Sequence, residues 1–275
     1  MLNSIATLGP EGTFSELACK KYIEKNQLDL NINYYSSIKK TLAAVGTQTG
    51  YAVLPIENFS EGFVNPVLDF LVSADLHICA QMVLPIQFSL VSHCVSADQI
   101  CKVYTQFVAQ GQCSDYLEEL SGVEFISTES NTQALMSIAS ESGSAAVIPS
   151  HLLKTHDFAY VVENITDYKD NQTRFLLLCA APLMEYSGNS VDYKTSIVVL
   201  FDNDHPGYLE SILNKFAAQG INLTSIVSRP TRKTFGNYHF FIDLDGHQED
   251  LNIKSALLDI QKKFKVKILG SYLRT

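Results

Sequence analysis

Short apolar runs alternate with segments of helical periodicity through the first two thirds of the chain. Residues 5–8 and 51–55 are predicted to be buried strands, and a segment with apolar residues at helical spacing follows each of them. Thr13, with Glu16 three residues later, is a capping box that predicts the start of the first helix. Strand–helix alternation of this kind is typical of a mostly parallel sheet covered by helices.

The middle of the chain repeats this layout. A second capping box, Ser130 with Gln133, predicts the start of another helix. In such folds ligands bind at the carboxyl ends of the strands, which is where Glu57 and Asn58 fall. The other predicted strands are 87–92, 102–104, 123–127, 145–148 and 160–163, and the other predicted helices are 38–45, 64–71, 108–120 and 134–140.

The pattern changes near residue 190. The segment 183–192 is largely polar and contains glycine, which predicts a linker. Beyond it the elements follow a βαββαβ order, which is that of the ferredoxin-like split unit. These elements are strand 195–201, helix 208–218, strands 221–229 and 238–244, helix 251–264 and strand 266–272.

The overall charge narrows the choice of partners. The 275 residues carry a net charge of -9, so the chain offers no basic stripe for nucleic acid. An anionic ligand must therefore be held by a local positive pocket against the overall field. No apolar run approaches the length of a membrane span, and the first residues form no signal peptide. We expect a cytoplasmic protein that binds neither nucleic acid nor membrane.

The cysteines and histidines give no sign of a metal site. The six cysteines form no Cys-x-x-Cys pair and most lie in apolar surroundings, so we expect free buried thiols ahead of disulfides or zinc ligands. The seven histidines lack the spacing of metal ligands. The sequence therefore predicts no metal and no other cofactor.

Three motifs carry the candidate chemistry. Residues 9–18, Gly-Pro-Glu-Gly-Thr-Phe-Ser-Glu-Leu-Ala, place a glycine turn before a helix N-terminus, whose free N–H groups suit a carboxylate. Residues 54–58, Leu-Pro-Ile-Glu-Asn, end a buried strand. Residues 173–175, Thr-Arg-Phe, follow a polar turn and open on an apolar run. Thr173 and Arg174 thus lie at a strand mouth, where a rigid element can hold side chains against a ligand.

In this order and at these separations, the three motifs resemble those of prephenate dehydratase, and segments 204–209 and 220–224 resemble the ACT regulatory domain. The resemblance covers essentially the whole chain. It implies an α/β fold with a two-lobed, periplasmic-binding-protein-like catalytic domain over residues 1–182 and an ACT domain over 193–275. Lobe one would comprise 1–79 and 158–182, lobe two would comprise 80–157, and a cleft would lie between them.

The resemblance also implies the reaction, which converts the dianion prephenate to phenylpyruvate, water and carbon dioxide. The ring hydroxyl is a poor leaving group and needs a hydrogen-bond donor, a role the resemblance gives to Thr173. Glu57 and Glu129 fall on cleft positions where a carboxyl group would hold the proton. The implied substrate-binding residues are Thr13, Asn58, Thr105, Gln112, Asn131, Arg174 and Phe175.

Some residues depart from the family pattern. Phe59 and Phe63 stand where the family has small residues, and Gln106-Phe107-Val108 replaces its His-Pro-Gln stretch. We expect the two rings at 59 and 63 to pack behind the pocket. These departures leave arogenate open as the substrate and a non-aromatising prephenate decarboxylase open as the activity. A non-catalytic amino-acid sensor is the alternative from a different class, although Glu57, Glu129 and Thr173 argue against it.

The regulatory segments imply phenylalanine as an effector, bound between subunits. Tyr208 in place of alanine and Val227 in place of glutamate predict that phenylalanine binds weakly or not at all. The exposed edges and half-covered face of an ACT sheet predict a homodimer or homotetramer. The residues that this resemblance assigns to the effector site are Gly207, Tyr208, Leu209, Asn222, Leu223, Ser228, Arg229 and Pro230.

Overall fold

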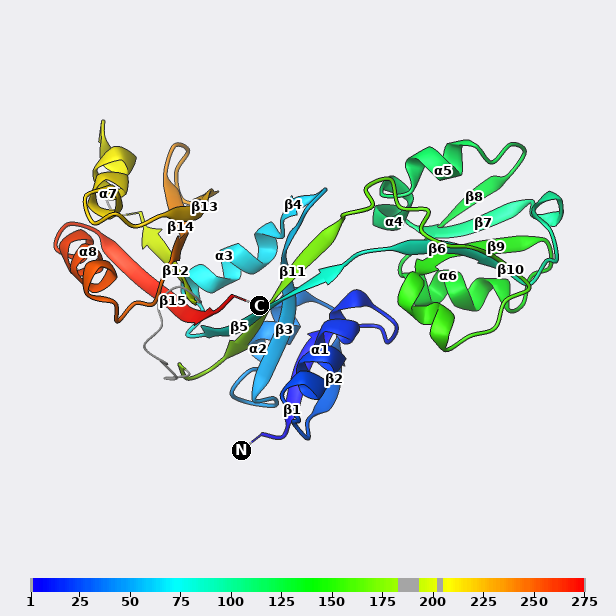
Figure 1. Ribbon diagram of the computed structural model, residues 1–275, viewed down its shortest axis with the longest axis horizontal. Coiled ribbons are helices and arrows are strands. Elements are labelled where there is room, and N and C mark those ends of the chain that lie inside the picture. Colours follow the sequence, from blue (N-terminus) through cyan, green and yellow to red (C-terminus); the bar gives the residue numbers. More distant parts are fainter. Residues whose placement is uncertain (1, 183–192, 202–204, 275) are drawn as a thin grey trace.

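The computed structural model describes residues 2–182, 193–201 and 205–274, so the predicted linker 183–192 lies outside the described residues. The chain forms three sheets arranged in a row (Figure 1). We call the unit built on the central six-stranded sheet lobe one, the unit built on the five-stranded sheet lobe two, and the unit built on the four-stranded sheet the C-terminal domain. The predicted α/β fold with two lobes and a ferredoxin-like unit is confirmed.

Lobe one has the strand order β2-β1-β3-β11-β5, with β4 paired to β3. β1 runs parallel to β2 and β3, whereas β11 runs antiparallel to both β3 and β5. The expected mostly parallel sheet is therefore mixed, because β11 returns from lobe two in the opposite direction. Its elements are β1 (Ser4–Leu8), α1 (Phe14–Lys25), β2 (Asn31–Tyr35), α2 (Ile38–Ala43), β3 (Tyr51–Asn58), β4 (Gly62–Phe63), α3 (Asn65–Ser73), β5 (His77–Pro85) and β11 (Gln172–Cys179).

The side chains of β11 alternate between two cores. Phe175 and Leu177 pack on the face that α1 covers, whereas Leu176 and Leu178 pack on the opposite face. Thr173 and Arg174 lie at the start of this alternation, so they point to opposite faces of the sheet. This division decides what each of the two residues can contact.

Lobe two has the strand order β10-β6-β9-β7-β8 and is also mixed. The helix predicted at 108–120 is broken at Gln112 and Cys113 into two short helices. The Asp167 carboxylate causes the break by accepting hydrogen bonds from the N–H groups of Ser114 and Asp115, which caps a new helix. The elements are β6 (Phe88–Ser92), η1 (Ala97–Gln99), β7 (Lys102–Gln106), α4 (Phe107–Gly111), α5 (Ser114–Glu118), β8 (Glu124–Thr128), α6 (Asn131–Ile138), β9 (Ser144–Pro149), η2 (Ser150–Lys154) and β10 (Tyr160–Val162).

The C-terminal domain has the predicted βαββαβ order and the strand order β13-β14-β12-β15. Its two helices pack on one face of the sheet through residues such as Ile212 and Ile260. The other face packs on lobe one, where Phe241 and Tyr272 join the core of α3 and β11. The elements are β12 (Tyr193–Leu200), α7 (Tyr208–Ala217), β13 (Leu223–Pro230), β14 (Tyr238–Asp245), α8 (Leu251–Gln261) and β15 (Lys265–Leu273).

The contact between β15 and β5 is a close backbone approach. Gly270 lies against β5 so tightly that a Cβ atom at this position would overlap the carbonyl oxygen of Ile78. The backbone of Gly270 has a φ of +152°, a value that residues other than glycine rarely adopt. Glycine at 270 therefore allows the C-terminal domain to seat directly on lobe one.

The cysteine prediction is wrong for one pair. Cys79 on β5 and Cys179 on β11 form a disulfide, with their Cα atoms 6.4 Å apart. The two residues are 100 positions apart in sequence, and pairing of β5 with β11 brings them together.

Within residues 2–182, 193–201 and 205–274, none of the helices combines the length and the apolar character that a membrane span requires.

Candidate functional site

Four polar side chains form one hydrogen-bonded chain where the polypeptide crosses between the lobes. The Nδ2 of Asn58 lies 2.8 Å from the Oγ1 of Thr173 and 3.0 Å from the Oδ1 of Asn171. The Nδ2 of Asn171 lies 3.1 Å from the Oε1 of Gln112. We call Asn58, Gln112, Asn171 and Thr173 the hinge cluster. Three of the four were predicted as site residues; Asn171 was not.

The backbone holds each member of the hinge cluster in place. Asn58 and Thr173 are direct partners in the β3–β11 ladder. Asn171 is fully buried, and its carbonyl oxygen accepts a hydrogen bond from the N–H group of Ile86. Gln112 ends α4, and its carbonyl oxygen accepts from the N–H group of Asp167. The cluster thus joins both lobes and the two segments, near Ile86 and near Asn171, in which the chain crosses from one lobe to the other.

The orientation of the Asn58 amide is set by the loop that follows it. Its Oδ1 accepts hydrogen bonds from the N–H groups of Ser60 and Glu61, both at 3.0 Å, and from the Ser60 hydroxyl at 2.8 Å. The Nδ2 group must then face Thr173, so the Thr173 oxygen accepts and its own O–H remains able to donate. By the same logic, Asn171 donates to the Oε1 of Gln112 and leaves the Nε2 of Gln112 as a donor.

Four other predicted residues lie at or just after the carboxyl ends of strands, outside the hinge cluster. Thr105 is buried at the end of β7, and its hydroxyl donates to the carbonyl oxygen of Gln106. Glu129 is exposed and Asn131 begins α6. Thr13 caps α1 by accepting from the N–H group of Glu16. Within the described part of the chain, none of these four side chains hydrogen-bonds to the cluster.

The predicted cradle for a substrate carboxylate at the start of α1 is partly taken up by a side chain of the protein itself. The carboxylate of buried Glu16 accepts from the N–H group of Gly12 at 2.5 Å and from the Tyr34 hydroxyl at 2.6 Å. Burial alone would raise the pKa of Glu16, but hydrogen bonds from Lys20, Tyr34 and Gly12 outweigh burial and lower it. This carboxylate is therefore ionised and uses the Gly12 N–H group, one of the donors proposed for the ligand.

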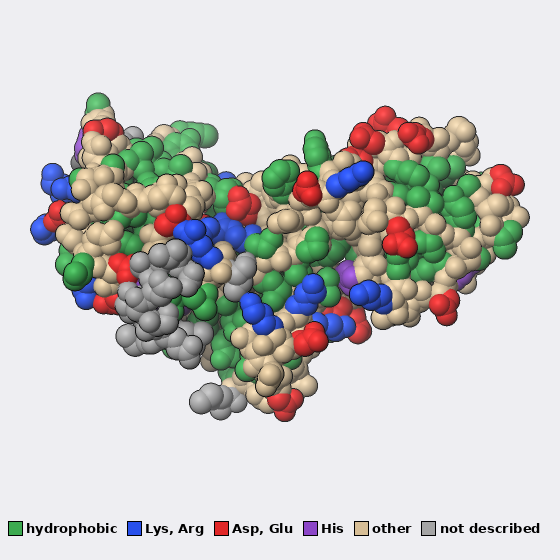
Figure 2. All heavy atoms as spheres, viewed as in Figure 1, with side chains coloured by type: hydrophobic (Ala, Val, Ile, Leu, Met, Phe, Trp, Pro, Cys, Tyr) green, Lys and Arg blue, Asp and Glu red, His purple; other side chains and the backbone are tan. Residues whose placement is uncertain are grey.

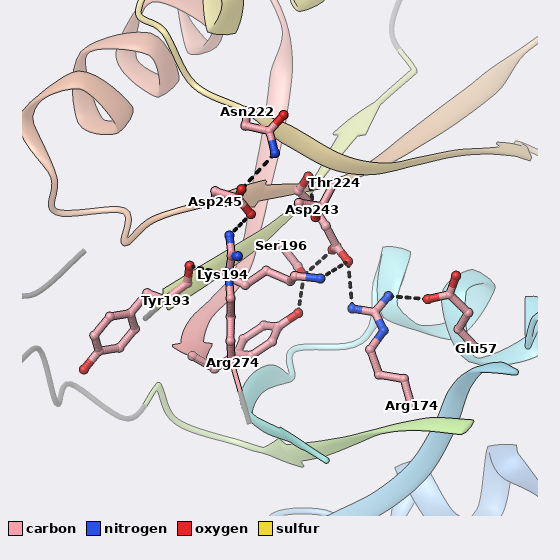
Figure 3. Close-up of polar contacts among 11 residues, drawn as sticks. Glu57, Arg174, Tyr193, Lys194, Ser196, Asn222, Thr224, Asp243, Asp245 and Arg274 are labelled. Carbon is pink, nitrogen blue, oxygen red and sulfur yellow. Dashed lines mark hydrogen bonds and ion pairs between the residues drawn. The ribbon is translucent and has the colours of Figure 1, made fainter. Parts of the chain in front are cut away.

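Glu57 and Arg174 lie on the face of the sheet opposite to Asn58 and Thr173. Figure 3 shows the Arg174 guanidinium between two carboxylates, with Nη1 2.8 Å from the Oδ2 of Asp243 and Nη2 3.1 Å from the Oε2 of Glu57. This placement replaces the predicted role of Arg174 as a clamp for substrate. It also separates the Glu57 carboxylate from the Thr173 hydroxyl, contrary to our expectation of a proton donor beside it.

A bulge in β3 explains which side chain faces which way. The ladder pairs Arg174 with Glu57 but Phe175 with Pro55, so Ile56 is an extra residue on β3. Without it, the alternation of core residues Ala52, Leu54 and Ile56 would put Asn58 toward the C-terminal domain. Bulges next to functional sites re-aim side chains in this way.

The structure agrees with some of the predictions for phenylalanine side chains and contradicts others. Phe175 is 2% exposed and packs under α1, so it belongs to the core and not to a substrate site. Phe63 packs behind the sheet, as expected. Phe59 is 72% exposed, so the expectation that it packs behind the pocket is wrong. Gln106 caps α4, with its Oε1 accepting from the N–H groups of Val108 and Ala109.

The residues assigned to the effector site are divided between two ends of the C-terminal domain. Gly207, Tyr208 and Leu209 begin α7, whereas Asn222 and Leu223 follow its other end. The Asn222 side chain donates to the Oδ2 of Asp245 at 2.8 Å. The remaining three residues, Ser228, Arg229 and Pro230, end β13; Arg229 forms an ion pair with Asp69 of lobe one, and Ser228 and Pro230 are exposed.

Tyr208 points into its own domain. Its ring is 5% exposed and meets the ring of Phe264 edge-on, with 4.9 Å between centroids, and that of Phe240 at 6.2 Å. The ring therefore fills the core between helices and sheet. This arrangement does not support the expectation that the ring takes the space of a ligand.

A cavity of 1100 Å³ lies between the lobes beside α1 and η2, apart from the hinge cluster. Figure 2 shows Lys and Arg side chains gathered over this lower middle part of the molecule. Acidic side chains among the lining residues (Glu11, Glu16 and Asp157) match the lysines (Lys20, Lys21 and Lys154) in number. The cavity therefore has no excess positive charge for a dianion, so charge does not single it out. We place the candidate active site at the hinge cluster because it joins three predicted site residues and keeps hydrogen-bond donors available.

Comparisons with known proteins find matches over both parts of the chain. The family model described as prephenate dehydratase matches residues 5–182, and that of the ACT domain matches 195–261. A bifunctional chorismate mutase/prephenate dehydratase of Aquifex aeolicus is 35% identical over 98% of this chain and 73% of its own length. A prephenate dehydratase of Methanocaldococcus jannaschii is 33% identical over 96% of this chain and 95% of its own length.

A solved structure is similar over the same span. The prephenate dehydratase of Arthrobacter aurescens, determined in complex with L-Phe, superimposes with a TM-score of 0.87 at 29% identity. The match covers 98% of this chain and 90% of that one. The similarity therefore includes both lobes and the C-terminal domain.

Proposed function

The chain belongs to the prephenate dehydratase family, and we propose that its hinge cluster carries out the conversion of prephenate to phenylpyruvate, water and carbon dioxide. The substrate dianion takes up one proton in this reaction. The bond to the ring carboxylate breaks, its electron pair enters the ring, and the hydroxyl leaves as water. The enzyme must therefore present a proton donor at the leaving oxygen and donors to the remaining carboxylate.

The observation that carries the proposal is the direction of the hydrogen bonds in the hinge cluster. Ser60 and Glu61 fix the Asn58 amide, so Asn58 donates to Thr173, and the Thr173 O–H is free to donate to the leaving hydroxyl. Asn171 similarly leaves the Nε2 of Gln112 as a donor. A threonine hydroxyl is a weak acid, so Thr173 polarises the leaving group and passes on a proton drawn from water. Both of these groups are therefore available as donors, which the substrate requires.

The other predicted site residues would line the cleft around this donor pair. Thr105, Glu129 and Asn131 lie at carboxyl ends of lobe-two strands, and Thr13 lies at the facing end of lobe one. We assign them to positioning of the substrate, with Glu129 as the exposed carboxyl group that can exchange protons with solvent. Glu57 acts from the other face of the sheet through Arg174.

The departures from the family pattern do not favour another reaction. Gln106 caps a helix and Phe63 packs behind the sheet, so neither enters the hinge cluster. The decisive experiment is incubation with prephenate and, in parallel, with arogenate. We expect phenylpyruvate, detected by its absorbance in alkali, from prephenate. A dihydro product without aromatic absorbance would assign a non-aromatising decarboxylase instead, and no turnover of either substrate would favour a sensor.

We further propose phenylalanine as the effector and a homodimer or homotetramer joined through the C-terminal domains. The A. aurescens relative was solved with L-Phe, and Tyr208 here leaves the surface at the start of α7 unblocked. Separation of the effector residues to two ends of one domain fits a site completed by a second copy. We propose a cytoplasmic location and domain boundaries of 1–182 and 193–275, joined by the linker 183–192.

A further inference from the structure

The residue beside Thr173 in sequence connects lobe one to the C-terminal domain. Arg174 is only 12% exposed, and Asp243, its partner on β14, is 13% exposed. The pair is 2.8 Å long and nearly excluded from water, so it is screened far less than a surface ion pair. Breaking such a pair leaves an uncompensated buried charge.

Asp243 is itself held by its own domain. Its Oδ1 accepts from the Ser196 hydroxyl at 2.5 Å (Figure 3), and the Ser196 hydroxyl lies 2.7 Å from the Tyr272 hydroxyl. The Nζ of Lys194 lies 3.8 Å from the Oδ2 of Asp243. Two neighbouring strands, β12 and β15, therefore fix the carboxylate that holds Arg174.

The ladder around Arg174 is irregular. The bulge at Ile56 interrupts the β3–β11 pairing directly after the Arg174–Glu57 step, one residue from the Asn58–Thr173 step. At a bulge the regular ladder is disrupted, and side-chain contacts have more influence on where the neighbouring residues lie. Arg174 supplies such contacts on both sides, to Glu57 on β3 and to Asp243 on β14.

We propose that Arg174 is a positioning residue for Thr173, and that its ion pair with Asp243 makes turnover depend on the seating of the C-terminal domain. The inference rests on the proposed function, because it acts through the hydroxyl assigned there. When Asp243 holds the guanidinium, the end of β11 is fixed and the Thr173 O–H points to the leaving group. When the pair is lost, Thr173 and Asn58 lose their register at the bulge.

A matched control exists at the other end of the same interface. Asp69 on α3 accepts two hydrogen bonds from Arg229 on β13, at 2.7 and 2.9 Å. This pair also joins lobe one to the C-terminal domain, and its residues are 16% and 17% exposed. It lies on α3, which contributes nothing to the hinge cluster. Losing it tests domain contact in general without touching β11.

The experiment compares Asp243→Asn, Asp243→Glu and Asp69→Asn in the full-length chain, each with and without Thr173→Ala, with prephenate as substrate. We expect Asp243→Asn to lower kcat roughly 10–100-fold with little change in KM, as for a displaced catalytic group. Asp243→Glu should recover most of the loss, and Asp69→Asn should stay within about twofold of the unaltered protein. In the Thr173→Ala background, Asp243→Asn should cause no further loss.

The variants separate positioning of Thr173 from a general structural defect. Full turnover by Asp243→Asn, or an equal loss in both backgrounds, overturns the inference, because a structural defect acts whether or not Thr173 is present. An equal loss from Asp69→Asn also overturns it. If Asp243→Asn fails to fold, Arg174→Lys enters the same cycle, since lysine keeps the charge but not the fork that spans both carboxylates. Failure of the proposed function is seen separately, as absence of phenylpyruvate from the unaltered protein.

Discussion

Asn58 and Thr173 face each other across β3 and β11, with 2.8 Å between the Nδ2 of one and the Oγ1 of the other. The two residues are 115 positions apart in sequence. The Asn58 amide is locked by Ser60 and Glu61, so it donates to Thr173 and leaves the threonine O–H able to donate to another group. The hydrogen-bonding role of Thr173 is thus decided by a loop that it does not belong to.

Replacement of Thr173 tests the donor directly. We expect Thr173→Ala to lower kcat ~10²–10³-fold with little effect on KM, because one donor to the transition state is lost. Thr173→Ser keeps the hydroxyl and should retain most of the activity. Steady-state kinetics on prephenate measure both variants. A loss of less than roughly fivefold for the alanine variant, or one confined to KM, would reject the assigned role.

Asn58→Asp tests the direction of the hydrogen bonds without changing size. A carboxylate at 58 still accepts from Ser60 and Glu61, but its second oxygen also accepts, so Thr173 must donate to it and not to the substrate. We expect kcat to fall on the order of 10²-fold near neutral pH and to recover partly toward pH 4, close to the ordinary aspartate pKa of about 3.9, where the carboxyl group gains a proton. The pH profile of kcat is the measurement, and a loss that does not vary with pH contradicts the assignment.

The lowered pKa of His151 predicts that the folded protein loses stability in acid. Burial lowers the pKa of His151 to about 4, against 6.5 for an unperturbed histidine. Between these values the unfolded chain binds a proton that the folded chain does not, so stability falls as the pH drops from about 6.5 toward 4. The cost between pH 7 and pH 5 is about 2 kcal/mol.

The His151 prediction is checked by thermal unfolding from pH 7 to pH 5. His151→Gln should flatten the pH dependence of Tm, whereas His156→Gln, at an exposed histidine nearby, should leave the slope unchanged. Because the chain has more than one unit, each calorimetric transition must be followed separately. The same slope for the His151→Gln variant and the unaltered protein would show that another group is responsible.

Substitutions at Tyr208 distinguish an effect on phenylalanine binding from an effect on the stability of the C-terminal domain. Removing a ring packed on Phe264 and Phe240 should destabilise the C-terminal domain by ~3–5 kcal/mol, so Tyr208→Ala is expected to lower its Tm. Tyr208→Phe keeps the ring and should change the Tm little. With the ring inside the core, we expect calorimetry to detect phenylalanine binding to the unaltered protein and to Tyr208→Phe alike. Absence of binding to both, with binding restored by Val227→Glu, would instead support a lost effector site.

The edge of the C-terminal sheet predicts self-association. β13 is one of the two terminal strands of the described sheet, and Ile226 on it is 46% exposed. Pairing with a second copy would cover this edge. We expect light scattering to give at least a dimer at micromolar concentration, and Ile226→Lys to weaken it. Val95→Lys, at an exposed apolar residue in lobe two, is the control, and a monomeric unaltered chain refutes the prediction.

The sequence reveals most elements of this fold because their signals are local, although β2 and β5 were not predicted. The capping residues Thr13 and Ser130 accept the hydrogen bonds that the pattern predicts, and all six elements of the C-terminal domain occur in the expected order. The break at Gln112 is different, because the carboxylate that causes it comes from Asp167, far along the chain. The Cys79–Cys179 pair likewise depends on the β5–β11 register.

The candidate site was predicted only in part, for a related reason. Neighbours on a strand point to opposite faces, so Glu57 and Asn58 cannot both line one cleft, and neither can Thr173 and Arg174. This rule can be applied from the sequence, without the structure. Which member of each pair faces the cleft does not follow from it, because that depends on the extra residue Ile56 in the ladder. Asn171 carries no sequence signal beyond its nearness to Thr173.

The position of β11 governs when the protein can be completed during synthesis. This strand lies between β3 and β5 in the sheet of lobe one, yet the ribosome makes it after all of lobe two. Lobe two is one continuous segment and can fold as it emerges from the ribosome. Lobe one stays incomplete until then, because the place between β3 and β5 is empty and both strands are made more than 80 residues before β11. Thr173 arrives with the strand that closes the gap, so a nascent chain gains the hydroxyl proposed as catalytic only when its first-made lobe is finished.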